Sequence, residues 1–402
     1  MLLPDPEPRE IFDLLISVDD HVIEPPNLFE GRLPAALADR APRLVEHDGA
    51  PAWQLEDRIL PNFGLNAVAG KPAEEWTDEP QGWDDMRRGC WDIDARMNDM
   101  DINGVYASVC FPSRIAGFGG VRFSEMKDQE LGLACMRAWN DWHLEEWASP
   151  YPDRIIPLQV PWLNDPSVAA DEIRRNAERG FKVVTFPDNP AALGHPPIWS
   201  DHWDPFMRAC EETQTVVACH IGASGTGAGG YDVTALDQAR SGAIATATTL
   251  VTGVMAAVTW LYGGVFTKFP GLRMTLAESG AGWVPALLDR LEYMEHHAGH
   301  AFTRAWTDEL SQTEVLLRNV KFCIFDDASA IALRHRIGVD NLLLEVDYPH
   351  GDGTWPDSQP FARKLLGDLP PGEIDKIMYQ NAAKLFRHPL PEGYSVDTSD
   401  AA

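Results

Sequence analysis

The fold class is decided by a strand–helix–strand pattern in the middle of the chain, which reads FKVVTF (181–186), WDPFMRACEET (203–213) and TVVACHI (215–221). The two outer runs are rich in β-branched residues, which is typical of buried strands. The segment between them repeats apolar residues at the spacing of a helix. This unit predicts a parallel sheet that helices cover on both faces.

The same pattern continues in both directions along the 402-residue chain. Six further runs of this kind are ISVDDHV (16–22), VYASVCF (105–111), RIIPLQV (154–160), LRMTLAE (272–278), VKFCIF (320–325) and NLLLEVD (341–347). Helix-length segments such as PSVAADEIRRNAERG (166–180) lie between most of them. Eight such units favour a closed (β/α)8 TIM barrel over an open sheet, and no GxGxxG motif follows the first run.

Two stretches do not fit the repeat. Residues 24–95 are rich in Pro, Trp and acids, and we expect them to form a lid over the barrel mouth, after the first strand. Residues 222–264 begin as a Gly-rich loop and continue as a long Ala/Thr/Val helix that is apolar on nearly every side. Such a helix is buried in its own core or against another subunit, so we expect a homodimer or a higher oligomer that uses residues 246–260. Residues 1–390 are predicted to form one domain, with a loose polar tail at 391–402.

The composition excludes several classes of partner. The formal charge of −28, from 61 acidic and 33 basic residues, would repel nucleic acid. The N-terminus lacks the basic and apolar regions of a signal peptide, and no apolar run reaches the roughly 18 residues that span a bilayer. The cysteines form no CxxC pair and read as buried, reduced thiols of a cytoplasmic protein: Cys90, Cys110, Cys135, Cys210, Cys219 and Cys323. A small molecule is the partner that remains.

Side chains that bind metals stand at the ends of three predicted strands. Asp19 and His21 are two residues apart, so they point to the same face of a strand. His220 and Asp347 each end an apolar run. Because barrel enzymes place their chemistry at the C-terminal ends of the strands, we expect these four side chains to meet. Imidazole and carboxylate ligands predict one divalent metal ion, with Zn favoured and Mn or Fe as alternatives.

Other polar residues are candidates for the same mouth. Glu278 ends the sixth run and can act as an acid or a base. Glu24 follows the first motif and can help to orient the metal ligands without binding the metal itself. Four residues are candidates for binding a substrate there: Arg87, Arg88, Arg114 and His350. Arginine is suited to this role because its guanidinium group can bind a carboxylate through two hydrogen bonds. A structural ion pair or cap is the alternative for each of them.

Taken together, these motifs resemble a known family. The segments VDDHVIEP, CHIGASG, LAESGAGWVPALLDRLEYM, EVDYPHGDGTWPDS and NAAKLF follow one another between Ser17 and Phe386. They are similar to the amidohydrolase-related proteins, which include aminocarboxymuconate semialdehyde decarboxylase and the γ-resorcylate-type decarboxylases. The resemblance implies a mononuclear metal that activates water or orients a carboxylate substrate. It places the ligands at Asp19, His21, His220 and Asp347.

The chain departs from the family pattern in two places. Decarboxylases of this family carry a histidine at the end of strand six, in a motif like HMGE, but this chain has Glu278 followed by Ser-Gly-Ala. This departure argues against decarboxylation. Binuclear relatives carry a carboxylated lysine at the end of strand four, whereas FKVVTF ends in Phe186. One metal ion is therefore favoured over two.

Three functions remain open. The leading hypothesis is metal-dependent hydrolysis of a small aromatic or carboxylated compound, with Asp347, Glu278 and His220 as catalytic residues. The first alternative is a non-oxidative decarboxylase of an aromatic or unsaturated acid. The second is a barrel that binds a metal or a ligand without turnover, because a fold alone does not fix a function.

Overall fold

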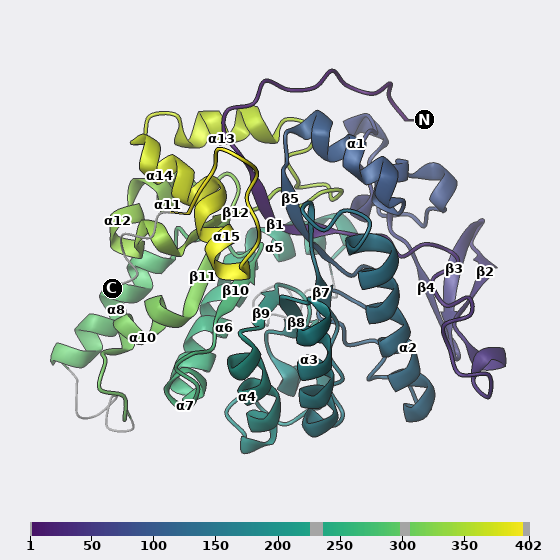
Figure 1. The fold of residues 1–402 in the computed structure, drawn as a ribbon, viewed down its shortest axis with the longest axis horizontal. Helices are drawn as coiled ribbons and strands as arrows, with labels where there is room; N and C mark the ends of the chain where they lie inside the picture. Colours follow the sequence, from purple (N-terminus) through teal and green to yellow (C-terminus); the bar gives the residue numbers. More distant parts are fainter. Residues whose placement is uncertain (1, 226–235, 298–305, 397–402) are drawn as a thin grey trace.

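The computed structural model describes residues 2–225, 236–297 and 306–396 (Figure 1). Parallel strands form two sheets, in the orders β1-β5-β6 and β12-β11-β10-β9-β8-β7. The strands are β1 Ile16–His21, β5 Ala107–Phe111, β6 Ile155–Ile156, β7 Leu158–Gln159, β8 Val183–Pro187, β9 Val216–His220, β10 Met274–Ala277, β11 Val320–Ile324 and β12 Leu342–Leu344. Each of the eight predicted stretches contains a strand, so the prediction of an α/β fold with parallel sheets is confirmed.

Helices follow most of these strands and surround the sheets (Figure 1). They are α1 Ile93–Asn103, α2 Gln129–Trp142, α3 Pro166–Arg179, α4 Asp204–Thr213, α5 Gln238–Ala247, α6 Thr249–Tyr262, α7 Val265–Lys268, α8 Val284–His297, α10 Gln312–Asn319, α11 Ala328–Ala332, α12 Arg334–Ile337, α13 Ser358–Leu366, α14 Pro371–Asp375 and α15 Asn381–Phe386. Local sequence sets their ends: the Asp165 side chain caps the start of α3, and Gly180 ends it with φ of 110°.

The strand register brings the chemistry-bearing residues to one end of the sheets. His220 ends β9 and pairs with Pro187 on one side and Ala277 on the other. Glu278 follows Ala277 directly and therefore lies beside His220. On the other sheet, His21 ends β1 and pairs with Phe111. The strand residues are almost all buried, which fixes this register against slippage.

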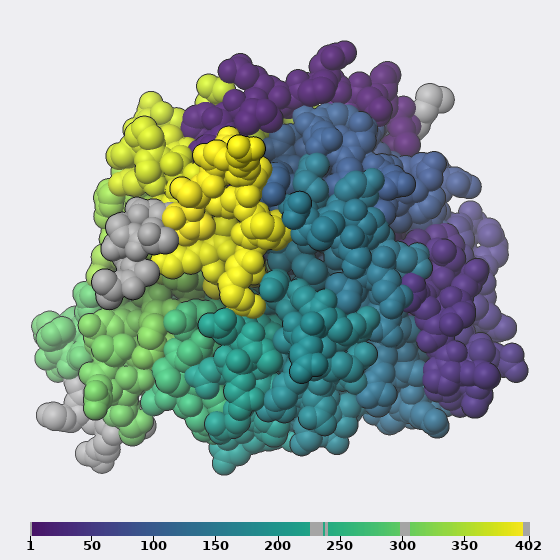
Figure 2. Space-filling model, viewed as in Figure 1, coloured from purple at the N-terminus to yellow at the C-terminus, as the bar shows by residue number. Residues whose placement is uncertain are grey.

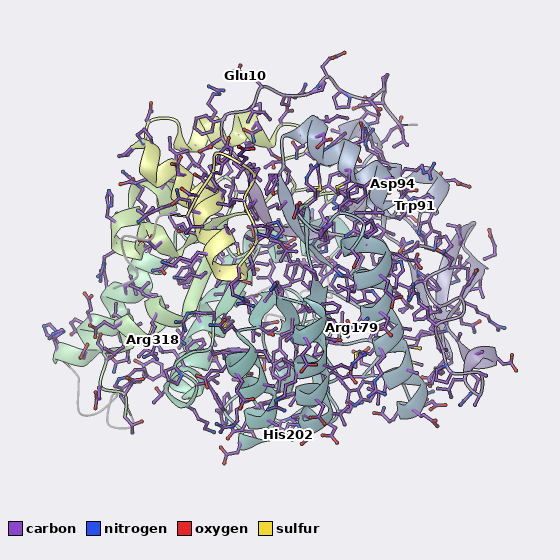
Figure 3. All side chains as sticks on the ribbon, in the orientation of Figure 1. Glu10, Trp91, Asp94, Arg179, His202 and Arg318 are labelled. Carbon is purple, nitrogen blue, oxygen red and sulfur yellow. The ribbon has the colours of Figure 1, made fainter. Side chains whose placement is uncertain are left out.

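The segment between β1 and α1 has two parts. An antiparallel sheet of β2 Arg43–His47, β3 Ala50–Leu55 and β4 Arg58–Pro61 lies at the flank beside α2 (Figure 1). The chain then returns to the turn after β12, where Gly351 N–H donates to Leu65 O and Val68 N–H donates to Pro349 O. Of the four tryptophans in residues 24–95, Trp53 and Trp83 are buried, Trp91 is partly buried beside α1 (Figure 3), and Trp76 is exposed.

The long apolar helix predicted within 222–264 is two helices instead of one. α5 and α6 meet at Thr248 with a bend of 44°, and the Thr248 hydroxyl donates to Ile244 O at this point. A hydroxyl that bonds to the backbone of the preceding turn bends helices. Residues 226–235 of the Gly-rich loop lie outside the described residues. Among the described helices, none alone is long and apolar enough to cross a bilayer. By length and composition only, α5 and α6 together would be, across their bend.

The cysteines and the C-terminal segment complete the fold. All six cysteines are buried and none forms a disulfide, as the sequence predicts. In the segment predicted to be a loose tail, Tyr394 packs edge-on against Tyr379, with 5.5 Å between the ring centroids. The last residues of that segment, 397–402, lie outside the described residues.

Candidate metal centre

Four strand ends bring histidines and carboxylates together. Asp19, His21 and His220 have no exposed surface, and Asp347 is 2% exposed. The Nε2 atoms of His21 and His220 face each other at 3.0 Å. Asp19 Oδ1 lies 3.6 Å from His21 Nε2, and Asp19 Oδ2 lies 3.6 Å from His220 Nε2. Asp347 Oδ1 lies 3.4 Å from His21 Nε2. Asp19, His21 and His220 therefore meet as expected, and Asp347 reaches the cluster at His21.

Two further side chains join this cluster. Glu278 Oε1 lies 3.4 Å from His220 Nε2 and 4.0 Å from His21 Nε2. His350 Nδ1 lies 2.9 Å from Asp347 Oδ1, and its ring stacks on His21 at 3.8 Å. The donor atoms lie within 4.8 Å of one another in each of two overlapping sets, which are Asp19, His21, His220 with Glu278, and His21, Glu278, Asp347 with His350.

The donor atoms fit a metal ion. His220 Nδ1–H donates to Ile221 O at 2.7 Å, which leaves the Nε2 lone pair directed at the cluster. Two nitrogens bonded to one ion at about 2.1 Å lie about 3.0–3.4 Å apart, and the observed separation is 3.0 Å. Both oxygens of Asp19 are buried and accept no hydrogen bond. A buried carboxylate in this state needs a cation.

The electrostatics of the cluster point to a cation as well. Burial, together with the negative charge of Glu278, raises the pKa of Asp19 and of Asp347 well above the usual range. Burial also acts to raise the pKa of Glu278, but the neighbouring His220 and His350 outweigh it and hold this pKa low. Burial, with the neighbouring His350 and His220, lowers the pKa of His21. A divalent cation would favour the charged carboxylates and neutral imidazoles that ligation requires.

The backbone at two of the strand ends is strained. Glu278 and Asp347 have φ of 55° and 56°, a left-handed conformation that is uncommon for residues other than glycine. Hydrogen bonds hold both residues in place: Glu278 N–H donates to the buried Glu345 carboxylate, and Asp347 N–H donates to Asp19 O. Strain of this kind is concentrated at functional sites.

The comparisons with known proteins fit this geometry. A family model described as Amidohydrolase matches residues 35–388. The chain belongs to this amidohydrolase family. The match begins after Asp19 and His21, so it is the fold that brings the first motif to the site. No curated protein sequence matches the chain.

Solved structures similar to this amidohydrolase include other amidohydrolases and several decarboxylases. An amidohydrolase from Mycobacterium avium subsp. paratuberculosis has 22% identity and a TM-score of 0.72, over 94% of this chain and 100% of that one. A 5-carboxyvanillate decarboxylase from Novosphingobium aromaticivorans, complexed with manganese and a nitrobenzoic acid, has 20% identity and a TM-score of 0.64, over 95% and 99%. A 2,6-dihydroxybenzoate decarboxylase from Rhizobium has 16% identity and a TM-score of 0.61, over 94% and 99%. At these identities the likeness shows a shared fold.

The other predicted site residues lie away from the cluster. Glu24 accepts hydrogen bonds from Ser113 N–H and from the Trp139 indole, and burial raises its pKa to about 7. It ties the loop after β1 to the loop after β5. Arg88 pairs with Asp92, and its side chain is 70% exposed. Arg114 donates to Pro61 O and stacks over Phe63. Arg87 is held by Asp99 and Asp5. Of the substrate-binding candidates, only His350 reaches the cluster.

Three residues of this amidohydrolase were missed by sequence reasoning. Phe118 lies against the rings of His21, His220 and His350, with centroid distances of 4.7, 4.6 and 5.5 Å. Nothing in the surrounding GFGG distinguishes it from a loop residue. Asp20 accepts from Tyr348 N–H and Ser108, and burial raises its pKa to about 6. The sequence did offer one signal for Asp20, which is its position between Asp19 and His21, on the opposite face of β1. The third residue is Glu345, described above.

A cavity of about 910 Å³ adjoins the cluster at Glu278. Its apolar wall is formed by Leu250, Trp283 and Phe325. Its polar lining includes Asp326 and Asp327 in addition to Glu278, and none of the described lining residues is Lys or Arg. This side of the cluster is therefore apolar and acidic.

Proposed function

We propose that this amidohydrolase is a mononuclear metal-dependent hydrolase of a small organic substrate. The observation that carries the proposal is the buried cluster of two facing histidines and several carboxylates, with Glu278 at the end of β10. The family match supports an enzyme of this superfamily. The acidic cavity beside Glu278 supports a substrate that carries no negative charge.

The residues proposed to hold the ion are Asp19, His21, His220 and Asp347. Mixed imidazole and carboxylate donors suit Zn or Mn, and three similar structures were solved with manganese. When bound, a divalent ion supplies Lewis acidity, which polarises the scissile group and promotes ionisation of water near neutral pH.

The chain's own residues would orient and move the proton. Glu278 keeps a low pKa through His220 and His350, so it is ionised and able to accept a proton from an attacking water. His350, 3.6 Å from Glu278 Oε1, orients that carboxylate. Asp347 lies between His21 and His350, where it can share with Glu278 the proton taken from the attacking water. Phe118 covers the three imidazole rings and excludes bulk water from that side.

The proposed substrate is neutral and has a planar apolar group. The cavity offers Trp283 and Phe325 for stacking, and an anion there would meet Glu278, Asp326 and Asp327.

We further propose that both parallel sheets belong to one (β/α)8 barrel. Backbone hydrogen bonds between β1 and the segment after β12 support this closure, because Asp347 N–H donates to Asp19 O and His21 N–H donates to Tyr348 O. The contacts of Leu65 and Val68 with the turn after β12 support a lid role for part of residues 24–95.

Isotope incorporation tests the proposed reaction. The Zn- or Mn-loaded protein is incubated in ¹⁸O water with neutral aryl esters and amides, and the acid product is analysed by mass spectrometry. We expect one labelled oxygen per turnover and loss of turnover in Asp19→Asn. Metal-loaded protein that leaves the whole neutral panel unchanged, while releasing carbon dioxide from hydroxybenzoates, would overturn hydrolysis.

Decarboxylation is the second candidate function. The structures that favour it are the 5-carboxyvanillate and 2,6-dihydroxybenzoate decarboxylases, which share the fold. In that reaction a protein acid has to deliver a proton to carbon, and Glu278 is the candidate at the end of β10. Hydroxybenzoates labelled with ¹³C in the carboxyl group separate the two candidates, because only decarboxylation releases that carbon as ¹³C-labelled carbon dioxide.

A further inference from the structure

A second cavity, of about 1120 Å³, lies at the other end of the strands. It is lined by Thr215 and Val216 at the start of β9, by Arg273 just before β10, and by Lys321 near the start of β11. His220 ends β9, so the length of that strand, about 13 Å, separates the cavity from the metal cluster. Part of the remaining wall comes from α15, which lies in front of β10 and β11 in Figure 1, with its yellow surface exposed in Figure 2.

The lining of this cavity is basic, although the chain as a whole carries a charge of −28. Five positive side chains face one negative side chain, Asp340. The positive side chains are Arg273, Arg318, Lys321, Lys384 and Arg387. Asp340 already pairs with Lys376 at 2.9 Å, and Lys376 is not part of the lining. The basic groups are therefore poorly compensated from within the cavity.

The partners of these groups are mostly neutral. Lys321 Nζ donates to the Asn341 side chain, Arg387 donates to Gln214 O, and Arg273 donates to Pro270 O and Leu272 O. Arg318, labelled on α10 in Figure 3, donates to Phe266 O and lies 3.6 Å from Asp308. Carbonyl groups position a guanidinium without neutralising its charge. The cavity thus holds several oriented donors that can bond an anion.

Mutual repulsion shows that these charges are close together. Burial, and then the neighbouring Arg273, lowers the pKa of Lys321 to about 8. Burial and the neighbouring Arg318 also lower the pKa of Arg273, and the acidic Glu211 nearby offsets them only in part. Like charges gathered in a partly buried cavity destabilise the fold unless an anion compensates them.

We propose that this basic cavity binds a small, multiply charged anion of the diphosphate class, either free or as the phosphate end of a nucleotide. Guanidinium groups recognise phosphate oxygens in pairs, and the ammonium groups of Lys321 and Lys384 add point charges. A nucleic acid is disfavoured because the strongly acidic chain would repel its extended backbone. The site is separate from the metal cluster, so the proposal does not depend on the proposed hydrolysis.

Calorimetric titration with inorganic pyrophosphate at constant ionic strength tests the site. Because pyrophosphate chelates metals, the titration uses the Asp19→Asn variant as well as the wild type, and we expect one equivalent to bind to both. The exposed residues Lys384 and Arg387 can be changed with little risk to folding. Lys384→Gln and Arg387→Gln should each weaken binding by about tenfold or more. The matched control is Arg240→Gln, which removes an exposed charge from α5 and should leave binding unchanged.

Parallel titrations with ADP and AMP identify the source of the anion. Tighter binding of ADP than of pyrophosphate would indicate a nucleotide, and the reverse order would indicate the free anion. Either order supports the site, provided that Lys384→Gln weakens it. No heat with any of the three at millimolar concentration would overturn the proposal, as would binding that survives the Lys384→Gln/Arg387→Gln double variant.

Discussion

At the scale of single residues, Asp19 is the group with the greatest need for a cation. Its carboxylate is fully buried and accepts no hydrogen bond, while burial and Glu278 raise its pKa. An isolated buried carboxylate is unfavourable by several kcal/mol. The same side chain becomes favourable when it ligates an ion together with His21 and His220, whose Nε2 atoms lie 3.6 Å away.

Asp19→Asn is therefore expected to weaken metal binding by more than the roughly 10–100-fold loss that follows removal of an outer-shell partner. Elemental analysis after dialysis, and the rise in melting temperature on adding Zn or Mn, measure the effect. Arg88→Gln is the control, because that exposed side chain lies outside the cluster. Normal metal content in Asp19→Asn would contradict the ligand assignment.

The metal-induced rise in melting temperature should grow with pH. In the folded metal-free protein the pKa values of Asp19 and Asp347 are raised, so protons stabilise this form at low pH, and that stability is lost as pH increases through the raised values. A metal must displace these protons, so its binding strengthens over the same range. Melting curves with and without Mn between about pH 5 and pH 8 measure this dependence. A constant difference across that range would contradict it.

Glu278→Gln keeps the shape of the side chain and removes its charge. We expect normal metal content and a kcat about 10²–10⁴-fold lower, because a general base is lost. Asp326→Asn is the control, since Asp326 lines the same cavity without contacting the histidines. Lost metal would make Glu278 a ligand, whereas near-normal kcat with a lower melting temperature would make it structural.

The four proposed metal ligands were predictable because their positions at strand ends and their residue types point to the same role. Asp19, His21, His220 and Asp347 each stand at the end of an apolar run, and parallel strands bring such ends together. The substrate-binding role predicted for the arginines stays a prediction, and within the described part of the chain none of their contacts is with the cluster. Nothing in the sequence says which way a loop side chain turns, and Arg88 turns to Asp92. Phe118 gave no signal, since its role depends only on the folded loop after β5.

At the scale of elements, α6 is pressed against the loop that carries Glu278. A Cβ added at Gly253 would lie 2.6 Å from Ser279 Cβ, so the two backbones approach too closely for any larger residue. Gly253→Ala should therefore lower stability by about 1–3 kcal/mol through overpacking and should also lower kcat, because Ser279 follows Glu278. Denaturant unfolding and steady-state kinetics measure the two effects.

Gly242 in α5 is the matched control for Gly253. A Cβ there meets nothing within 4 Å, so Gly242→Ala should be neutral or stabilising by about 0.5–1 kcal/mol. Equal stabilisation by both changes would show that helix propensity, and not contact with Ser279, decides the outcome.

Elements were more predictable than their junctions. Apolar runs marked every parallel strand, because a buried strand needs apolar side chains on both faces. The break between α5 and α6 was not visible, since Thr248 is one of many threonines and only its bond to Ile244 O marks the bend. The antiparallel sheet of residues 43–61 lies beside α2. Its buried Trp53 packs edge-on against Phe29, and Phe29 packs edge-on against Phe123 in the segment that precedes α2.

At the scale of the whole molecule, the acidic charge and the apolar surface of α6 act in opposite directions on self-association. The charge of −28 keeps copies of the chain apart, and most strongly at low salt. One face of α6 is covered by the core through Ala257 and Trp260, while Leu250 and Met255 on the same helix are 44% and 59% exposed. Trp199, close to Gly263 at the end of α6, is 58% exposed and extends this apolar surface.

We therefore expect the protein to form a dimer through α6, and the dimer to tighten as salt screens the acidic charge. Light scattering coupled to size-exclusion chromatography measures the mass at micromolar concentration and at two salt concentrations. Met255→Glu should shift the protein to the monomer, because it places a charge in the apolar contact. Leu333→Glu, at an exposed leucine between α11 and α12, should not. A wild-type monomer at both salt concentrations, or a dimer that survives Met255→Glu, would show that α6 contacts no second copy.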